Sequence, residues 1–143
     1  MVAEPDTLTP RVALDSNVLV YAVAGSGAKA DAAMSLVRRG GVISVQALNE
    51  TANVLRRKTA LDWPEVEEAL GLLRRLLDVV PLDEATHERG LRLARATGYS
   101  VWDAMILSAA LGAGCATLIT EDMQDGREVE GLVIRDPFAR AGG

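Results

Sequence analysis

Cysteine and histidine each occur once in this chain of 143 residues, and their scarcity excludes several kinds of site. Cys115 has no partner for an internal disulfide, so we expect a small buried thiol in a protein of the reducing cytoplasm. His87 stands among charged residues of a predicted helix, and we expect it at the surface rather than in a serine–histidine–aspartate set. The sequence also has no glycine-rich nucleotide-binding loop and no Walker motif.

Aromatic residues make up only 3% of the chain, against 49% hydrophobic residues, so the predicted core is aliphatic. No apolar run reaches the roughly 20 residues that are needed to cross a bilayer. No signal-peptide pattern stands at the N-terminus. We therefore expect no contact with a membrane.

Positive charge is scarce as well, because the formal net charge is −5. This balance argues against a protein that coats nucleic acid through bulk electrostatics. The basic residues are nevertheless mostly arginines, whose forked side chains bind phosphate in a bidentate way. Several stand side by side, at 38–39, 56–57 and 74–75. They either solvate helix faces or form a local surface for phosphate groups.

The hydrophobic pattern alternates between short β-type runs and helical periodicity. The first predicted strand, 12–14, passes directly into a helix that Asp15 or Ser16 caps. Further strands are predicted at 42–45, 78–81, 117–120 and 132–134, and further helices at 28–39, 46–58, 63–77, 84–97 and 100–112. This alternation indicates an α/β layered domain with a mostly parallel sheet. We expect a loosely ordered leader at 1–10, one domain at 11–138 and a tail at 139–143.

Four acidic residues, Asp15, Glu50, Asp103 and Asp122, fall at strand ends or in the first turns of helices. Each has a simple structural explanation when it is taken alone. Asp15 can be a helix cap, Glu50 a solvated helix residue, Asp103 half of a capping box with Ser100, and Asp122 the start of a turn. The topology, however, maps all four to the same edge of the sheet, where parallel α/β proteins bind their ligands.

Carboxylates that share a site repel one another, and their pKa values rise unless a cation neutralises them. Hard divalent cations such as Mg²⁺ or Mn²⁺ prefer oxygen ligands of this kind. A carboxylate-bound metal ion can activate water and stabilise the charge of a phosphodiester during displacement. The four acids therefore predict metal-assisted phosphodiester hydrolysis.

Four segments in this order resemble the PIN-domain family, and in particular the VapC-type toxins of bacterial toxin–antitoxin pairs: 12–21 (VALDSNVLVY), 44–50 (SVQALNE), 100–106 (SVWDAMI) and 118–122 (LITED). The resemblance covers about residues 11–138. It implies a three-layer α/β/α sandwich around a mostly parallel sheet. Members are Mg²⁺- or Mn²⁺-dependent endoribonucleases, usually homodimers, which a small antitoxin inhibits.

The resemblance also implies roles for individual residues. Asp15 and Asp103 fall on direct metal ligands, while Glu50 and Asp122 would act through water or orient the attacking water. Asn17 and Thr120 would support the site, and Asp125 is a candidate extra acid. Two departures from the family pattern are a serine, Ser16, where threonine is commoner, and a second acid, Glu121, which leaves the fourth ligand ambiguous.

Two further predictions concern surfaces. Arg56 and Arg57, with Lys58, stand on the helix of Glu50 and would hold RNA phosphates or acidic groups of the antitoxin. The helix after Pro64 has more aliphatic residues than one core-facing stripe needs, with Leu70, Leu73 and Leu77 on the stripe. We assign Val66, Ala69, Leu72 and Leu76 to an adjoining face that would form a symmetric dimer.

Two alternatives to the ribonuclease toxin stay open at this point. One is a PIN-fold module that is catalytically weak and binds RNA or a protein. The other is an enzyme for a different phosphoester, such as DNA or a small phosphomonoester.

Overall fold

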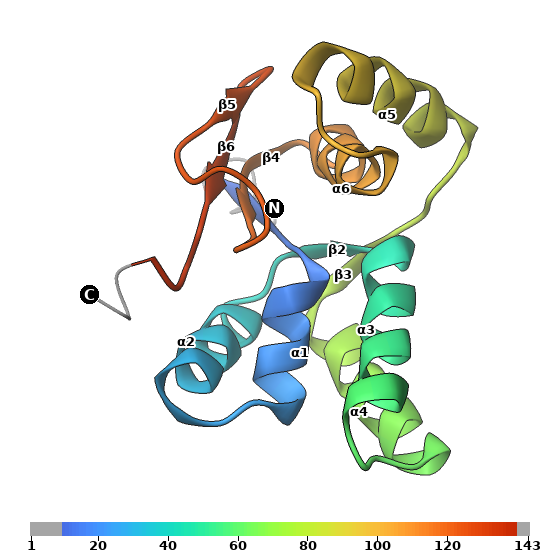
Figure 1. Ribbon diagram of the computed structural model, residues 1–143, viewed down its shortest axis with the longest axis vertical. Helices are drawn as coiled ribbons and strands as arrows, with labels where there is room; N and C mark the ends of the chain where they lie inside the picture. The colour runs from blue at the N-terminus through green and yellow to red at the C-terminus, as the bar shows by residue number, and fades with distance from the viewer. Residues whose placement is uncertain (1–9, 140–143) are drawn as a thin grey trace, which may run out of the picture.

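The computed structural model describes residues 10–139 and contains six strands: β1 (Arg11–Leu14), β2 (Val42–Ser44), β3 (Asp78–Val80), β4 (Cys115–Ile119), β5 (Glu128–Val129) and β6 (Leu132–Arg135). They form one sheet in the order β3–β2–β1–β4–β6–β5 (Figure 1). Every neighbouring pair is parallel except β5 and β6. The expected mostly parallel sheet is therefore confirmed, with the two-residue β5 as an addition that the sequence pattern did not indicate.

The six helices are α1 (Ser16–Ala24), α2 (Gly27–Arg38), α3 (Val45–Lys58), α4 (Trp63–Leu76), α5 (Glu84–Thr97) and α6 (Val101–Gly112). Helices α1 to α4 contact one another, whereas α5 packs along α6, which also contacts β2 and β4 (Figure 1). The sheet thus separates two groups of helices, as an α/β/α sandwich requires. The expected leader lies outside the described residues except for Pro10, and so does the expected tail except for residue 139.

Side-chain caps mark where every described helix except α2 begins, and two of these caps stand at strand ends. Ser44 follows the last core position of β2 and accepts a hydrogen bond from the backbone N–H of Ala47 at 3.0 Å, which starts α3. Asp62 and Glu65 form a reciprocal capping box at the start of α4. Because α1 and α3 begin where β1 and β2 end, their first turns lie at the carboxyl edge of the sheet.

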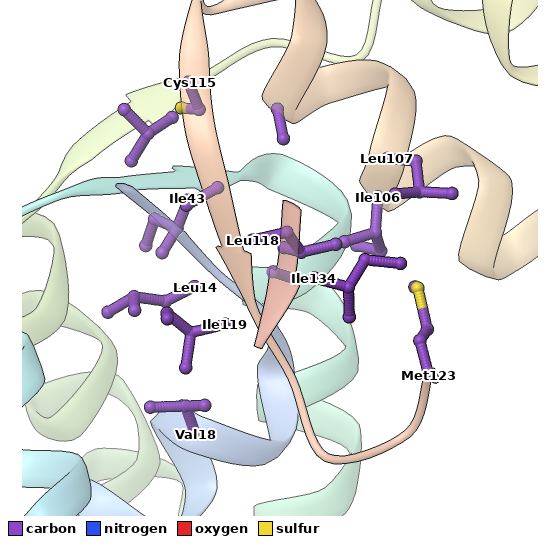
Figure 2. Close-up of a cluster of buried hydrophobic side chains, with 14 of the residues drawn as sticks. Leu14, Val18, Ile43, Ile106, Leu107, Cys115, Leu118, Ile119, Met123 and Ile134 are labelled. Carbon is purple, nitrogen blue, oxygen red and sulfur yellow. The ribbon is translucent and has the colours of Figure 1, made fainter. Parts of the chain in front are cut away.

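The core is aliphatic, as the composition predicts, and it joins the sheet to both helical groups. Leu14, Ile43, Leu118 and Ile134 project from four neighbouring strands and are nearly or fully buried (Figure 2). Cys115 is a buried free thiol, which confirms its expected role. Ordinary apolar burial of this kind contributes roughly 25 cal/mol for each Å² removed from water.

Close packing between α5 and α6 depends on a glycine. A Cβ atom at Gly90 would lie only 2.4 Å from the sulfur of Met105 on α6, so no larger residue fits there without displacing that side chain. This contact packs α5 against α6, the helix that carries Asp103 in its first turn.

One face of α4 differs from the expectation. Val66, which we assigned to an outer face, is fully buried together with Leu73. The two residues are seven positions apart, which places them on the same side of a helix. The outer apolar face of α4 therefore has fewer residues than predicted. Of that face, Leu72 is partly buried and Leu76 is 39% exposed.

None of the helices within residues 10–139 combines the length and the apolar composition that a membrane span would need.

Candidate functional site

Asp15 stands at the junction of β1 and α1, and both oxygens of its carboxylate accept hydrogen bonds. Oδ1 accepts from the backbone N–H of Ser16 at 2.7 Å, which makes Asp15 the cap of α1. Oδ2 accepts from the hydroxyl of Thr120 at 2.9 Å. The residue is only 3% exposed. The simple explanation of Asp15 as a helix cap is thus correct for one oxygen, and the second oxygen faces the end of β4.

Asn17 connects this junction to the segment that follows β4. Its amide nitrogen donates to the Thr120 hydroxyl at 3.0 Å and to Oδ2 of Asp122 at 3.1 Å. Its amide oxygen accepts from the backbone N–H of Glu121 at 3.3 Å. The Thr120 hydroxyl also accepts from the backbone N–H of Asp122 at 3.1 Å. Asn17 and Thr120 therefore lie where supporting residues were predicted, between two of the candidate acids.

Glu50 reaches the same region from the second turn of α3. The amide of Gln46, one helical turn earlier, donates to Oε2 of Glu50 at 3.4 Å. The nearby Ser16 side chain, at the start of α1, lowers the pKa of this carboxylate against the larger rise from burial. Glu50 is thus partly buried and lies near the start of α1, rather than freely solvated.

Asp103 lies in the first turn of α6. Its backbone N–H donates to the hydroxyl of Ser100 at 3.1 Å, so the expected helix cap exists. This cap uses the main chain of Asp103, and the Ser100 side chain also lowers the pKa of the Asp103 carboxylate, against the larger rise from burial. The side chain is only partly buried.

The pKa values show that the acids act on one another. Burial raises the pKa of Asp15 from 3.8 to about 6, against the hydrogen bonds from Ser16 and Thr120, and the charges of Glu50 and Asp122 add to the rise. Burial also raises the pKa of Glu50, with further contributions from Asp103 and Asp122. The pKa of Asp103 is raised by burial and then by the charge of Asp122. Carboxylates from four separate segments therefore form one electrostatic group.

No basic side chain in the described part of the chain neutralises these four acids. The ion pairs within residues 10–139 join Arg11 to Asp78, Lys29 to Glu121 and Arg92 to Glu130. Protons or a bound cation would relieve the repulsion among these acids. A set of carboxylate oxygens suits a hard divalent cation such as Mg²⁺ or Mn²⁺.

The fit to a metal ion rests on this donor chemistry and on the unneutralised charge. Within residues 10–139, no three acidic, histidine or cysteine side chains converge tightly enough to hold an ion as they stand. Asp15, Glu50, Asp103 and Asp122 would have to draw closer together around a cation that screens their repulsion.

Two predicted contributors have other partners. Oδ1 of Asp125 accepts from the backbone N–H of Asp136 at 2.9 Å, so Asp125 ties a loop to the chain after β6. The guanidinium of Arg56 lies 4.7 Å from the ring centre of Trp63 and donates to the carbonyl of Leu61 at 3.0 Å. Within residues 10–139, neither Asp125 nor Arg56 forms a hydrogen bond or an ion pair with any of the four acids, so their roles at the site stay predictions. Arg57 is exposed, about 10 Å along the helix axis from Glu50.

Sequence reasoning missed two residues at the site. Gln46 binds Glu50 and stands four positions before it, a spacing that places side chains on the same helix face and offered a usable signal. Lys29 pairs with Glu121 at 3.6 Å, beside Asp122. Lys29 comes from a different helix, and nothing in the local sequence pointed to it.

Solved structures with a similar fold include three from bacterial toxin systems. A toxin–antitoxin complex from Klebsiella pneumoniae matches with a TM-score of 0.68 and 19% identity, over 88% of this chain and 97% of that chain. VapC20 of Mycobacterium tuberculosis, described as a sarcin–ricin loop cleaving toxin, matches with a TM-score of 0.62 and 18% identity, over 75% and 86%. The DNA-bound VapBC of Salmonella typhimurium matches with a TM-score of 0.63 and 20% identity, over 90% and 99%.

At these identities the structural similarity establishes the fold. No curated protein sequence matches this chain. The model of one family, the PIN domain, matches residues 12–126, which is most of the sequence and includes all four candidate acids. The chain therefore belongs to the PIN domain family.

Proposed function

We propose that this protein is a metal-dependent endoribonuclease and the toxin of a toxin–antitoxin pair. One observation carries the proposal: carboxylates from four segments form a single electrostatic group that no basic side chain within residues 10–139 neutralises. Family membership supports it, because PIN nucleases generally use divalent metal ions.

In this proposal Asp15 and Asp103 are direct ligands of Mg²⁺ or Mn²⁺, and Glu50 and Asp122 act through water. The bound ion would supply a more acidic water and would stabilise charge on the phosphodiester. Glu50 is suited to accept the proton of that water, because its raised pKa brings it closer to the working pH. Asn17 and Thr120 keep Asp15 and Asp122 in register through their shared hydrogen bonds.

RNA is the proposed substrate, and a small antitoxin is the proposed partner. The Mycobacterium neighbour is described as a toxin that cleaves the sarcin–ricin loop, and the Klebsiella neighbour as a toxin–antitoxin complex. From the resemblance to VapC-type toxins, we also propose that the protein acts in the cytoplasm and that it forms a homodimer. Arg57 and Lys58 remain candidates for contact with RNA, since both are exposed.

The test is cleavage of a structured RNA with Mg²⁺, with Mn²⁺ and with a chelator. We expect Asp15→Asn and Asp103→Asn to abolish cleavage while circular dichroism shows an intact fold. Glu88→Gln, which changes an exposed acid on α5, is the matched control and should cleave like the wild type. Full activity of either aspartate variant at saturating metal would refute the site. Single-stranded DNA and a chromogenic phosphate tested in parallel would reveal a different phosphoester as substrate.

The alternative is a PIN-fold module that binds RNA or a protein with little turnover. The observation that favours it is that no three acidic, histidine or cysteine side chains within residues 10–139 are grouped closely enough to hold an ion as they stand. RNA binding without metal-stimulated cleavage would establish this alternative over the ribonuclease.

A further inference from the structure

Gln46 is a buried amide between two of the helices that carry candidate ligands. It lies in the first turn of α3 and is only 6% exposed. Its Nε2 atom donates to the backbone carbonyl of Trp102 at 2.9 Å and to Oε2 of Glu50 at 3.4 Å. Trp102 directly precedes Asp103 in the first turn of α6. One side chain thus touches the carboxylate of one acid and the backbone next to another.

The chemistry at this point calls for a neutral group with two donors. Both neighbours of the Gln46 amide are acceptors, a carbonyl and a carboxylate, and a primary amide offers two N–H groups on one nitrogen. A glutamate at this position would set a second carboxylate against Glu50, and an apolar residue would give neither acceptor a donor. The reversed amide would point its oxygen at both acceptors, so the arrangement is chemically determined.

The amide oxygen of Gln46 forms no hydrogen bond within the described part of the chain, so this side chain acts here only as a donor. Oε1 of Gln46 is buried and has no hydrogen-bond partner within residues 10–139. Leaving a buried polar atom unpaired is unfavourable. If position 46 only had to fill space, an apolar side chain would therefore be more stable there than glutamine. The side chain is therefore placed for the two acceptors that it joins.

We infer that Gln46 is a positioning residue, whose two donated hydrogen bonds fix the spacing between the Glu50 carboxylate and the first turn of α6 that carries Asp103. The inference rests on the proposed metal-dependent site. Gln46 acts through its neighbours, because α3 and α6 are separate elements and the amide links their first turns. Partners of this kind orient ligands, and their loss typically weakens metal binding 10- to 100-fold.

The experiment measures Mn²⁺ binding directly, in the absence of RNA, by calorimetry and by the electron paramagnetic resonance signal of the bound ion. Gln46→Met keeps the length of the side chain and removes both donors. We expect it to weaken Mn²⁺ binding about 10- to 100-fold. In cleavage assays at a fixed metal concentration it should lower kcat while the KM for RNA changes little.

Two further variants separate positioning from general loss of packing. Ser108→Ala removes a buried hydrogen bond from Ser108 Oγ to the carbonyl of Thr86, on the same helix as Asp103. It should bind Mn²⁺ like the wild type. Gln46→Asn keeps the amide but shortens the side chain, and it too should bind Mn²⁺ more weakly because it cannot reach both acceptors. It serves as the test if Gln46→Met does not fold.

A double-mutant cycle completes the test. In a Glu50→Gln background, Gln46→Met should cost less Mn²⁺ affinity than in the wild type, because one of the groups that Gln46 orients is already lost. If wild type binds Mn²⁺ and the Gln46 variants bind it equally well, or if the cycle is additive, the positioning role is wrong while the proposed function stands. If wild type neither binds Mn²⁺ nor cleaves RNA, the proposed function fails and the inference fails with it.

Discussion

Burial of Asp15 links the stability of the protein to pH. Its pKa is about 6 in the folded chain, against 3.8 for an exposed aspartate. Between these two values the folded state retains a proton that the unfolded chain has released. The contribution of Asp15 to stability is therefore fully present below pH 3.8, falls as pH rises, and is lost above about pH 6.

Replacing Asp15 with asparagine should consequently stabilise the metal-free protein at pH 7.5. A pKa of about 6 in place of 3.8 corresponds to about 3 kcal/mol, and the loss of the acceptor for the Thr120 hydroxyl reduces the expected gain to about 1–2 kcal/mol. Denaturant unfolding with a chelator present measures this difference. Its size should decline at pH 4, where the wild-type carboxyl is largely protonated. An equal gain at both pH values would show that charge is not its cause.

At the level of single residues, sequence reasoning could find the acids but not all of their partners. Asp15 and Asp122 each follow a strand of the predicted parallel sheet, so the sequence placed both at the same edge. The structure adds that these two strands are neighbours. The contact between Gln46 and the carbonyl of Trp102 joins residues 56 positions apart. Such a contact depends on how two helices pack, which no local pattern encodes.

The connection between α3 and α4 shows how elements use their charged residues. Arg56, in the last turn of α3, stacks over Trp63 of α4 and donates to the carbonyl of Leu61 in the connection, so it joins the two helices. Arg57 is its exposed neighbour. Two adjacent arginines that look alike in the sequence therefore have different surroundings.

This difference predicts opposite effects for two alanine variants. Arg56→Ala should destabilise the protein by about 0.5–1 kcal/mol, the usual value of an exposed cation–π contact, and should leave the salt dependence of RNA binding unchanged. Arg57→Ala should leave stability unchanged and flatten that salt dependence. Thermal unfolding and RNA titrations at several salt concentrations measure the two effects. If neither variant changes the salt slope, both arginines are excluded from the RNA surface.

Most helices begin at or within a residue or two of their predicted positions because their caps are visible in the sequence. Asp62, Asp83 and Ser100 each accept a hydrogen bond from the residue three positions later. Two features escaped prediction for physical reasons. β5 is only two residues long and exists through its pairing with β6. The inner face of α4 is selected by the helices around it, which is why Val66 was assigned to the wrong side.

At the scale of the whole molecule, three exposed apolar side chains stand on or beside an edge strand of the sheet. β3 is the edge strand beside β2, and it follows α4 directly. Leu76 is 39% exposed, Val79 37% and Leu82 43%, and they lie close together in the sequence around this strand. Exposed edges and apolar patches are usually covered by a partner. A second copy of this chain would cover both through a two-fold axis.

The predicted dimer can be tested at Leu76. Leu72 is a poorer choice, because it lines a groove with Ala22 and Met34 and its replacement would disturb packing within the monomer. We expect Leu76→Glu to remain folded, to shift the protein from dimer to monomer at micromolar concentration, and to cleave RNA more weakly. Light scattering coupled to size exclusion measures the mass. Leu91→Glu, at a residue of α5 that is 45% exposed, is the matched control and should stay dimeric. A wild-type protein that is monomeric throughout the micromolar range without its antitoxin would show that this edge is not a dimer interface.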